Sequence, residues 1–163
     1  METIKNIKSR ISVRKYLDKP VDKSIIEDIV DCGRMAPSGY NHQPWVFVAV
    51  TSEALREKIA DRCRYGKFIK QAGACIAVFC RESECRLEDA CAATENMIIA
   101  AQAYGLGTCW VNSYHKEHSS DIEKMLNCQQ GYELVVMRAV GHPDEQRQTP
   151  KKPLEEVLRW QSF

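Results

Sequence analysis

The chain has 163 residues, a length typical of one folded domain, and 44% of them are hydrophobic. This composition excludes a disordered chain, because there is enough apolar surface to build a buried core. With 23 Lys and Arg against 22 Asp and Glu, the net charge is +1, which argues against a general attraction to nucleic acid or anionic membranes.

The N-terminal residues and the cysteine content bear on the compartment. The first ten residues carry Ile4 and Ile7 as isolated apolar residues, which is not the apolar core of a secretory signal. No stretch approaches the ~20 apolar residues that a membrane-spanning helix needs. The eight cysteines make up about 5% of the chain, below the ~8–10% of small disulfide scaffolds. We therefore expect a cytoplasmic protein with reduced thiols, and neither a membrane nor a nucleic-acid partner.

The first periodic segments predict a helix followed by a strand. Ser24 and Glu27 have the spacing of a capping box and an apolar stripe follows, so we expect a helix that opens at Ser24 and ends before Pro37. Residues 45–50 (Trp-Val-Phe-Val-Ala-Val) form a continuous apolar run rich in β-branched and aromatic side chains. Such a run predicts a strand that is covered on both faces.

Two further apolar runs predict the rest of a central sheet. They cover residues 74–80 and 134–140, and only Arg138 interrupts the second run. Between the first two strands, a helix is expected from Ser52 through Cys63. The chain has no internal repeat, low-complexity tract or flexible linker, so residues 1–163 are predicted to form a single domain.

The second half of the chain contains an unusually apolar helix. Residues 87–104 are apolar around almost the whole circumference of a helix, which predicts that this helix is buried. So small a domain has little material of its own to cover it, and this favours a partner subunit. Ser120 and Glu123 repeat the capping-box spacing and predict a short helix through Leu126. A last helix is expected after Pro153.

Several common catalytic and metal-binding motifs are missing. The glycines of residues 105–107 follow a helix instead of a strand and lack the third glycine of a dinucleotide-binding turn. The chain contains no phosphate loop, nucleophile elbow or zinc-protease motif. The remaining candidate ligands lack zinc or iron–sulfur spacing and are interpreted as packing thiols and surface histidines: Cys80, Cys85, Cys91, His115 and His118.

A short basic segment near the N-terminus suits an anion. In Arg10-Ile11-Ser12-Val13-Arg14, the alternation of an extended chain places Arg10, Ser12 and Arg14 on one side and the two apolar residues on the other. Two fixed cations that flank a hydroxyl are suited to a phosphate ester. The alternative, a basic edge that Ile11 and Val13 merely pack in place, remains open on this motif alone.

The loop of residues 36–45 has more constraints than a plain connection needs. Its sequence is Ala-Pro-Ser-Gly-Tyr-Asn-His-Gln-Pro-Trp, in which two prolines stiffen the chain and a glycine allows close backbone approach. This stretch resembles the Pro-Ser-x-x-Asn-x-Gln-Pro-Trp signature of the nitroreductase family, and residues 10–14 resemble the family's Arg-x-Ser-Val-Arg opening.

The resemblance extends over essentially the whole chain. It includes Gly-Leu-Gly-Thr-Cys-Trp at residues 105–110, Gly-His-Pro at 141–143, and Lys-Lys-Pro-Leu-Glu-Glu-Val at 151–157, all in the family's order. It implies an α+β fold with a central mixed β-sheet flanked by helices. It also implies an intertwined homodimer with FMN at the subunit interface, NADH or NADPH as hydride donor, and a small-molecule electron acceptor.

The resemblance also implies the roles of individual residues. One subunit would supply cations and a hydroxyl to the FMN phosphate, ribityl chain and pyrimidine edge, and the second would supply the proline loop. Gly107 and the backbone around residues 111–113 would lie near the reacting edge of the flavin. The implied cofactor-binding residues are Arg10, Ser12, Arg14, Pro37, Ser38, Gly39, Asn41, Gly107, Val111, Asn112, Lys151 and Lys152. Tyr40 should face the substrate pocket, and no side chain is expected to act as a catalytic acid, base or nucleophile, since flavin N5 carries the chemistry.

These implications give three hypotheses of function. The first is an FMN-dependent oxidoreductase that passes a hydride from NAD(P)H through flavin N5 to a nitroaromatic, quinone or similar acceptor by a ping-pong mechanism. The second is a non-catalytic flavin-binding or sensing protein, because Asn112 and Ser113 stand where the family usually has glycine. The third, a thiol-based metal or redox module, rests on the cysteine content alone.

Overall fold

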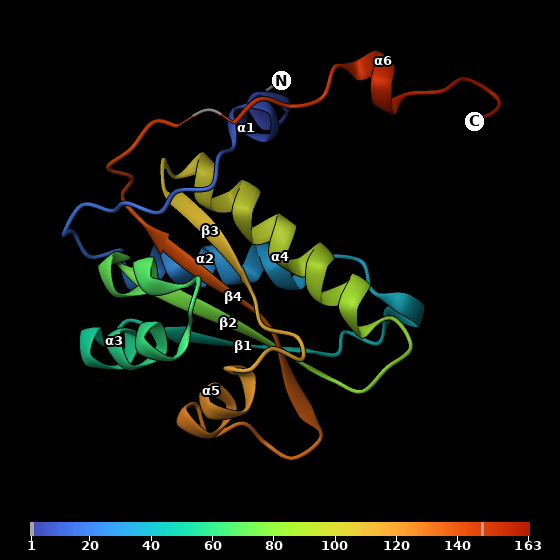
Figure 1. Ribbon diagram of the computed structural model, residues 1–163. Coiled ribbons are helices and arrows are strands. Elements are labelled where there is room, and N and C mark those ends of the chain that lie inside the picture. Colours follow the sequence, from blue (N-terminus) through green and yellow to red (C-terminus); the bar gives the residue numbers. More distant parts are fainter. Residues whose placement is uncertain (1, 148) are drawn as a thin grey trace.

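The structure is a computed structural model that describes residues 2–147 and 149–163 (Figure 1). The helices are α1 (Glu2–Ser9), α2 (Lys23–Arg34), α3 (Glu53–Arg62), α4 (Arg86–Ala103), α5 (Ser119–Met125) and α6 (Leu154–Val157). The strands are β1 (Trp45–Val50), β2 (Ala74–Arg81), β3 (Gly107–Asn112) and β4 (Tyr132–Gly141), and two short 3-10 helices are η1 (Gly39–Asn41) and η2 (Lys67–Gln71). Among the described residues, no helix is long and apolar enough to span a membrane.

The four strands form one sheet in the order β1-β2-β4-β3, and helices flank it. The predicted α+β fold is confirmed, but each neighbouring pair of strands runs antiparallel, so the four strands do not form the expected mixed sheet. The reason is that α4 carries the chain from β2 to β3 as a parallel crossover, and β4 then inserts between these two strands, antiparallel to both. In the part of the chain that the structure describes, parallel pairing is limited to an isolated bridge between Ser12 and Thr108.

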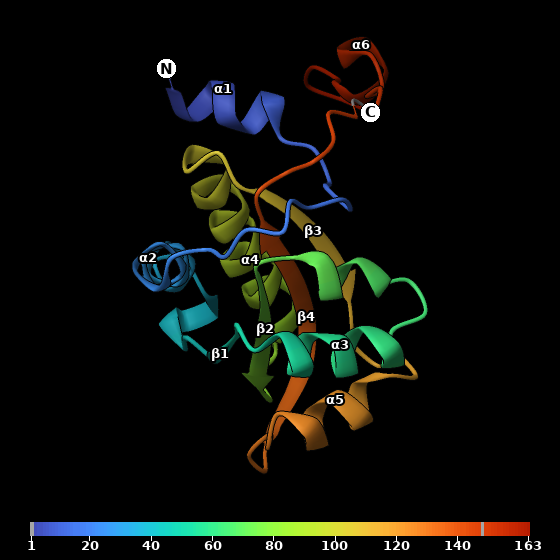
Figure 2. The ribbon, with the colours of Figure 1, turned by 90° about the vertical axis from the view of Figure 1, so that its left-hand side faces the viewer.

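The sheet separates two apolar clusters. On one face, α2 and α4 cover alternate strand residues such as Ile76 and Val78, and on the other face α3, η2 and α5 cover the intervening Cys75 and Ala77 (Figure 2). Because both faces of β2 and β4 are covered, these strands are continuous apolar runs in the sequence.

The outer strands differ from the predictions. β1 lies at an edge of the sheet, and it is not covered on both faces as expected, because Val46 is 44% exposed. β3 was not predicted, because its sequence Gly-Thr-Cys-Trp-Val-Asn is neither an apolar run nor an alternating pattern. Pairing with β4 makes this segment a strand.

The helix ends predicted from the prolines and from Ser52 are observed, whereas the two helix starts predicted from capping-box spacings are not. The helix expected after Ser52, the stop before Pro37 and the helix after Pro153 are all observed. The expected caps Ser24 and Ser120 are wrong, because the N-cap positions belong to Asp22 and His118, and neither makes a side-chain cap bond.

The second capping-box acid has a tertiary role instead. The Glu123 side chain accepts the backbone N–H of Leu134 at 2.8 Å, which ties α5 to β4. Because the Glu123 carboxylate accepts a hydrogen bond from β4, it does not fold back onto the start of its own helix. The capping-box rule considers only residues within the helix and therefore does not predict a bond to a distant strand.

α4 is buried on one face only. Ala90, Ala93 and Met97 pack against α2 and the sheet, whereas Cys91 and Glu95 on the opposite side are exposed. The prediction of a buried helix is therefore confirmed for one face only, and the other face of α4 is open, with acidic as well as apolar side chains.

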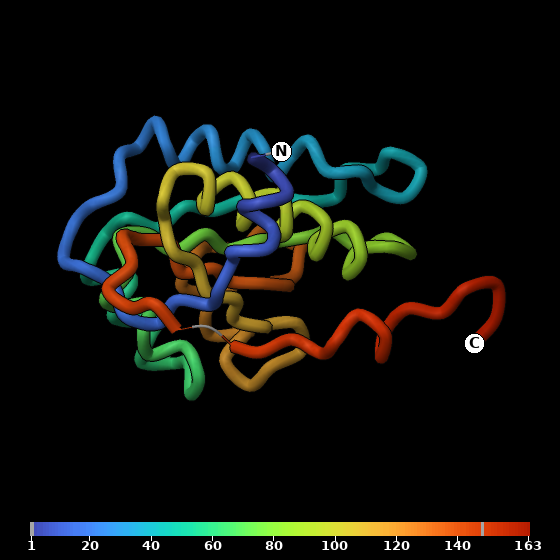
Figure 3. Tube along the Cα trace, turned by 90° about the horizontal axis from the view of Figure 1, so that it is seen from above, coloured from blue at the N-terminus to red at the C-terminus, as the bar shows by residue number. Residues whose placement is uncertain are grey.

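The C-terminal segment projects away from the sheet and its covering helices (Figures 1 and 3). It carries large apolar side chains, yet Leu154, Val157, Trp160 and Phe163 are all exposed, Trp160 by 75%. Isolated in solution, such an arm would expose apolar surface that proteins normally cover.

Candidate functional site

The basic segment of residues 10–14 lies along the free edge of β3. Ser12 bridges Thr108, and the backbone N–H of Val13 donates to the Thr108 carbonyl at 2.9 Å. Val13 is buried and Ile11 packs against the same apolar cluster, so the predicted alternation is confirmed. The segment is thus fixed by its apolar side, while Ser12 is half-buried and Arg14 is exposed on the other.

Gly107 allows this close approach. A Cβ added at Gly107 would lie 2.7 Å from Val13 Cγ2 and 2.8 Å from Val13 Cβ. A side chain at this position would push residues 10–14 away from β3, so a glycine is required where the two segments meet.

The chain turns sharply at the end of β3. Val111 is buried toward α3, Asn112 is exposed, and the next residue, Ser113, is fully buried. The backbone N–H of Ser113 donates to the Val135 carbonyl at 3.1 Å, and its Oγ lies 3.1 Å from His118 Nε2. The Asn112-Ser113 step is therefore held by β4 and by the loop before α5.

A groove of about 400 Å³ opens beside this turn. It is lined by the predicted residues Val111 and Asn112 and by others that the sequence did not single out: Arg64, Tyr65, Trp110, Lys116, Glu117 and His118. The groove brings the loop after α3 next to the loop before α5, and no pattern within either loop indicates this proximity.

The two histidines at 115 and 118 do not act as a pair. His115 stacks on Tyr114 and lies 3.6 Å from Glu133, whereas His118 contacts Ser113 and lines the groove. Burial lowers the pKa of His118, which favours the neutral imidazole at physiological pH.

The proline loop is held in a strained conformation. Tyr40, Asn41 and Gln43 have φ values of 50°, 56° and 46°, in the left-handed region that non-glycine residues rarely occupy. Ser38 Oγ accepts the Gln43 backbone N–H at 2.9 Å, which closes the loop on itself.

Asp89 holds this loop from the first turn of α4, and the sequence did not single it out. Its Oδ1 accepts the Gly39 backbone N–H at 2.9 Å, while Oδ2 has no hydrogen-bond partner among the described residues. Asp89 is buried, so this carboxylate sits under the loop and not in solvent. No local sequence pattern indicates this role of Asp89, because the contact joins residues that are fifty positions apart.

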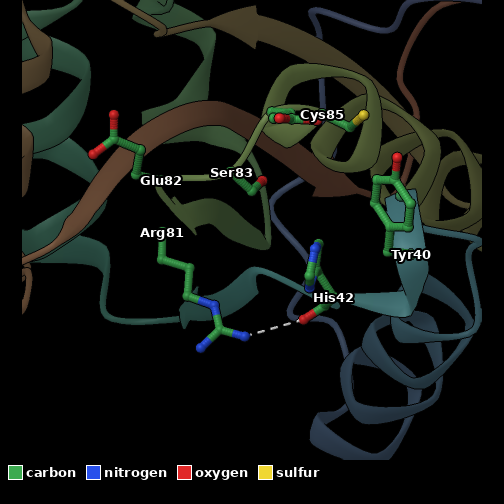
Figure 4. A pocket seen from close by; sticks show the side chains of 8 residues that line it. Tyr40, His42, Arg81, Glu82, Ser83 and Cys85 are labelled. Carbon is green, nitrogen blue, oxygen red and sulfur yellow. Dashed lines mark hydrogen bonds between the residues drawn. The ribbon is translucent and has the colours of Figure 1, made fainter.

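A second pocket, of about 610 Å³, adjoins the proline loop (Figure 4). Gly39, Tyr40 and His42 line one side, and residues 81–85 line the other. The side chain of Arg81 donates to the His42 carbonyl at 3.2 Å, which fixes the loop to the end of β2 (Figure 4). Tyr40 is 84% exposed at the mouth of this pocket.

The predicted site residues therefore form separate groups within one chain. Residues 10–14 meet β3 at Gly107, the groove lies at the far end of β3, and the proline loop lies at the C-terminal end of α2, beside the first turn of α4 (Figure 1). Lys151 and Lys152 are exposed on the C-terminal segment before α6.

Only some of the cysteines are packing residues: the interpretation is confirmed for Cys80, which is buried, whereas Cys85 is half-buried and Cys91 is exposed, so it is wrong for Cys91. All eight are free, and burial raises the pKa of Cys63 to about 11 and those of Cys75 and Cys80 to about 12. Thiols with such values are almost entirely protonated at neutral pH and are poor nucleophiles. Among the described residues, no three Cys, His, Asp or Glu side chains form a cluster that could hold a metal.

We expect Gly107→Ala to destabilise the protein by about 1–3 kcal/mol, because the new methyl group overlaps Val13. Chemical denaturation measures this loss. The double variant with Val13→Ala loses the overlaps with Cγ1 and Cγ2 and keeps only that with Cβ, so the combined loss should be smaller than the sum of the two single losses. Strictly additive losses would contradict the close contact.

Asp89→Ala is expected to loosen the proline loop, because the Gly39 N–H loses its acceptor. Hydrogen exchange of the amides of residues 38–43 should accelerate, with a loss of about 1–3 kcal/mol in unfolding free energy. Glu88→Ala, which alters an exposed neighbour on α4, is the matched control. Equal protection of the loop in both variants would refute the role of Asp89.

Comparison with known proteins identifies the family. The Nitroreductase family model matches residues 7–79 and 66–142. The chain is 28% identical over 154 residues to an Archaeoglobus fulgidus protein with the provisional name NADH dehydrogenase/NAD(P)H nitroreductase, covering 90% of this chain and 88% of the relative. A Bacteroides thetaiotaomicron structure with the same provisional name superposes with a TM-score of 0.94 at 30% identity, covering 100% and 99% of the chains. A provisionally named nitroreductase from Desulfovibrio desulfuricans, in complex with FMN, superposes with a TM-score of 0.84 at 28% identity, covering 99% and 97%. The chain thus belongs to the nitroreductase family.

Proposed function

We propose that the protein is an FMN-dependent NAD(P)H oxidoreductase that reduces a nitroaromatic, quinone or similar acceptor by a ping-pong mechanism. Nitroreductase-family relatives named for NAD(P)H and a similar structure in complex with FMN support the general activity. The observation that carries the proposal is the basic segment of residues 10–14, which β3 holds with Ser12 and Arg14 turned away from the apolar cluster.

The residues along β3 suit a phosphorylated flavin. Arg10 and Arg14 would neutralise the phosphate and the pyrimidine edge, and the Ser12 hydroxyl would donate between them. Gly107 keeps this segment against the strand, and Asn112 reaches the groove where an aromatic ring could lie. Lys152 and Lys151 would reach the phosphate from the C-terminal segment.

FMN, when bound, would supply a hydride acceptor at N5, so the proposal requires no side chain to act as a nucleophile or catalytic acid. The residues of this chain would bind and orient. Backbone groups of residues 111–113 would fix the reacting edge, since β4 and His118 hold Ser113 in place. The groove is open to solvent on one side and could admit substrates of several shapes.

The whole chain would act as one domain and as half of a homodimer. A second copy could cover the exposed apolar arm that follows β4 and the open face of α4, where Leu87 and Cys91 lie beside Glu88 and Glu95. In such a dimer, Pro37, Ser38, Gly39 and Asn41 of one subunit would approach the flavin of the other, which explains why this loop lies apart from residues 10–14 in the single chain. Tyr40 would then face the substrate.

The activity is tested with purified protein and added FMN. We expect a yellow complex that NADH or NADPH bleaches under anaerobic conditions and that a nitroaromatic or quinone re-oxidises. Arg10→Ala should weaken FMN binding by about 1.5–3 kcal/mol, roughly 10- to 150-fold in Kd, because a charge-assisted hydrogen bond is lost. Lys8→Ala, on the exposed side of α1, should leave the Kd unchanged.

Failure to bind FMN, or an unchanged Kd for Arg10→Ala, would count against the flavin site. Flavin that binds but stays yellow with excess NADH and NADPH would instead support a non-catalytic flavin-binding or sensing protein. A steady-state comparison of both nicotinamides with several acceptors then identifies the preferred substrates.

The role of the C-terminal arm is tested by Trp160→Ser. If a second copy covers this side chain, the substitution should shift the sedimentation equilibrium toward monomer and weaken FMN binding at the same time. Leu17→Ser, which also replaces an exposed apolar residue, is the control. A Trp160 variant with an unchanged oligomeric state would contradict the role of the arm.

A further inference from the structure

Arg138 is a fully buried cation in the middle of the sheet. It lies on β4, opposite Trp110 of β3 and Ile76 of β2, and only 1% of its surface is exposed. The same residue interrupts an otherwise apolar strand in the sequence. Arg138 is not among the residues to which a role in cofactor binding has been given so far.

The contacts of Arg138 leave its guanidinium half-satisfied. Nη1 donates to Thr108 Oγ1 at 3.1 Å, and the guanidinium carbon lies 5.2 Å from the centre of the Trp110 ring. Nε and Nη2 are buried and have no hydrogen-bond partner among the described residues. Burial lowers its pKa to about 10, so the side chain keeps its positive charge at neutral pH.

The charged groups around Arg138 act on it from a distance. Glu95 approaches from α4 and Arg10 from the N-terminal segment, while Tyr16 and Cys109 are neutral at physiological pH. The Glu95 side chain is exposed, and Arg138 takes part in no ion pair among the described residues. Proteins rarely retain a buried cation without a carboxylate, since an apolar side chain of similar volume usually gives equal or greater stability.

Two contacts connect this charge to the candidate site. Thr108, which accepts from Arg138, is also the residue that bridges Ser12 and bonds Val13. Trp110, over which the guanidinium lies, lines the groove at the end of β3. Arg138 therefore stands directly behind the strand against which the proposed flavin would bind, in surroundings of low dielectric where a charge acts over a longer distance.

We propose that Arg138 is a positioning residue that stabilises the negative charge of a reduced flavin bound along β3. The inference rests on the proposed function. A hydride carries two electrons and one proton. Its transfer from NAD(P)H to N5 would therefore produce NAD(P)+ and a reduced flavin with a negative charge near N1. A fixed cation behind β3 favours this reduced form over the neutral oxidised form and so raises the reduction potential.

The competing explanation is that Arg138 only packs against Trp110. Arg138→Met separates the two roles, because methionine fills a similar volume without charge. If the charge acts on the flavin, the variant should keep or gain thermal stability, as expected when a buried unpaired cation is removed, and its bound flavin should be harder to reduce. If Arg138 only packs, the properties of the flavin should not change.

The experiment measures two quantities on the FMN-loaded protein, neither of which is turnover. One is the reduction potential by equilibration with a reference dye, and the other is the Kd for sulfite, which adds to N5 and leaves a negative charge on the ring. We expect Arg138→Met to weaken sulfite binding at least tenfold and to lower the potential by about 30 mV or more, the equivalent of tenfold for two electrons. Arg138→Lys should recover most of both, and Arg34→Met, an exposed arginine on α2, should match the wild type.

Unchanged potential and sulfite Kd in Arg138→Met would overturn the role of Arg138. Should that variant not fold, Arg138→Gln keeps a hydrogen-bonding side chain without the charge and replaces it in the same comparison. A wild-type protein that binds FMN and is bleached by NAD(P)H, together with unchanged variants, refutes this inference alone. A wild-type protein that binds no FMN refutes the proposed function as well.

Discussion

The pairing of β3 on both of its edges is the constraint on which the rest of the candidate site depends. β4 pairs with one edge over the full length of β3, and residues 12–13 occupy the other edge at Thr108. Without β4, the short and partly polar β3 would have no reason to be extended. Without β3, the basic N-terminal segment would lose its pairing at Ser12 and Val13 and keep the packing of Ile11 and Val13 and the hydrogen bonds to Glu145. One strand thus places the cations at one end and the groove at the other.

α4 contacts both the sheet beside β3 and the proline loop, which lie apart in the single chain. Its buried face packs on the sheet beside Arg138 and β3, and Asp89 in its first turn holds the proline loop through Gly39. Its outer face remains open. This one helix therefore takes part in both the core and the support of the proline loop.

Positively charged side chains gather near β3, although the net charge of the chain is only +1. Arg10 and Arg14 lie near the surface, and Glu145 accepts the backbone N–H groups of Arg14 and Lys15 and so fixes the chain beside them. Arg138 lies beneath them without an ion-pair partner in the described residues. Surface cations bind an anion by contact, whereas a buried one acts through a medium that screens poorly. The two kinds of cation can therefore serve one site in different ways.

The sequence by itself determined the strands β2 and β4, the helices α3 and α4, and the positions where prolines end or precede helices, because continuous apolar runs and proline geometry act locally. It also contained the family motifs at residues 10–14 and 36–45. Only the tertiary structure decided that Gly107–Asn112 is a strand, that Asp22 and His118 occupy the N-caps, and that Arg64 lies across a groove from Lys116. The same holds for Asp89 under Gly39 and for the burial of Arg138. These features arise from contacts between residues distant in sequence, and a local pattern of side chains does not encode which distant segment will lie beside it.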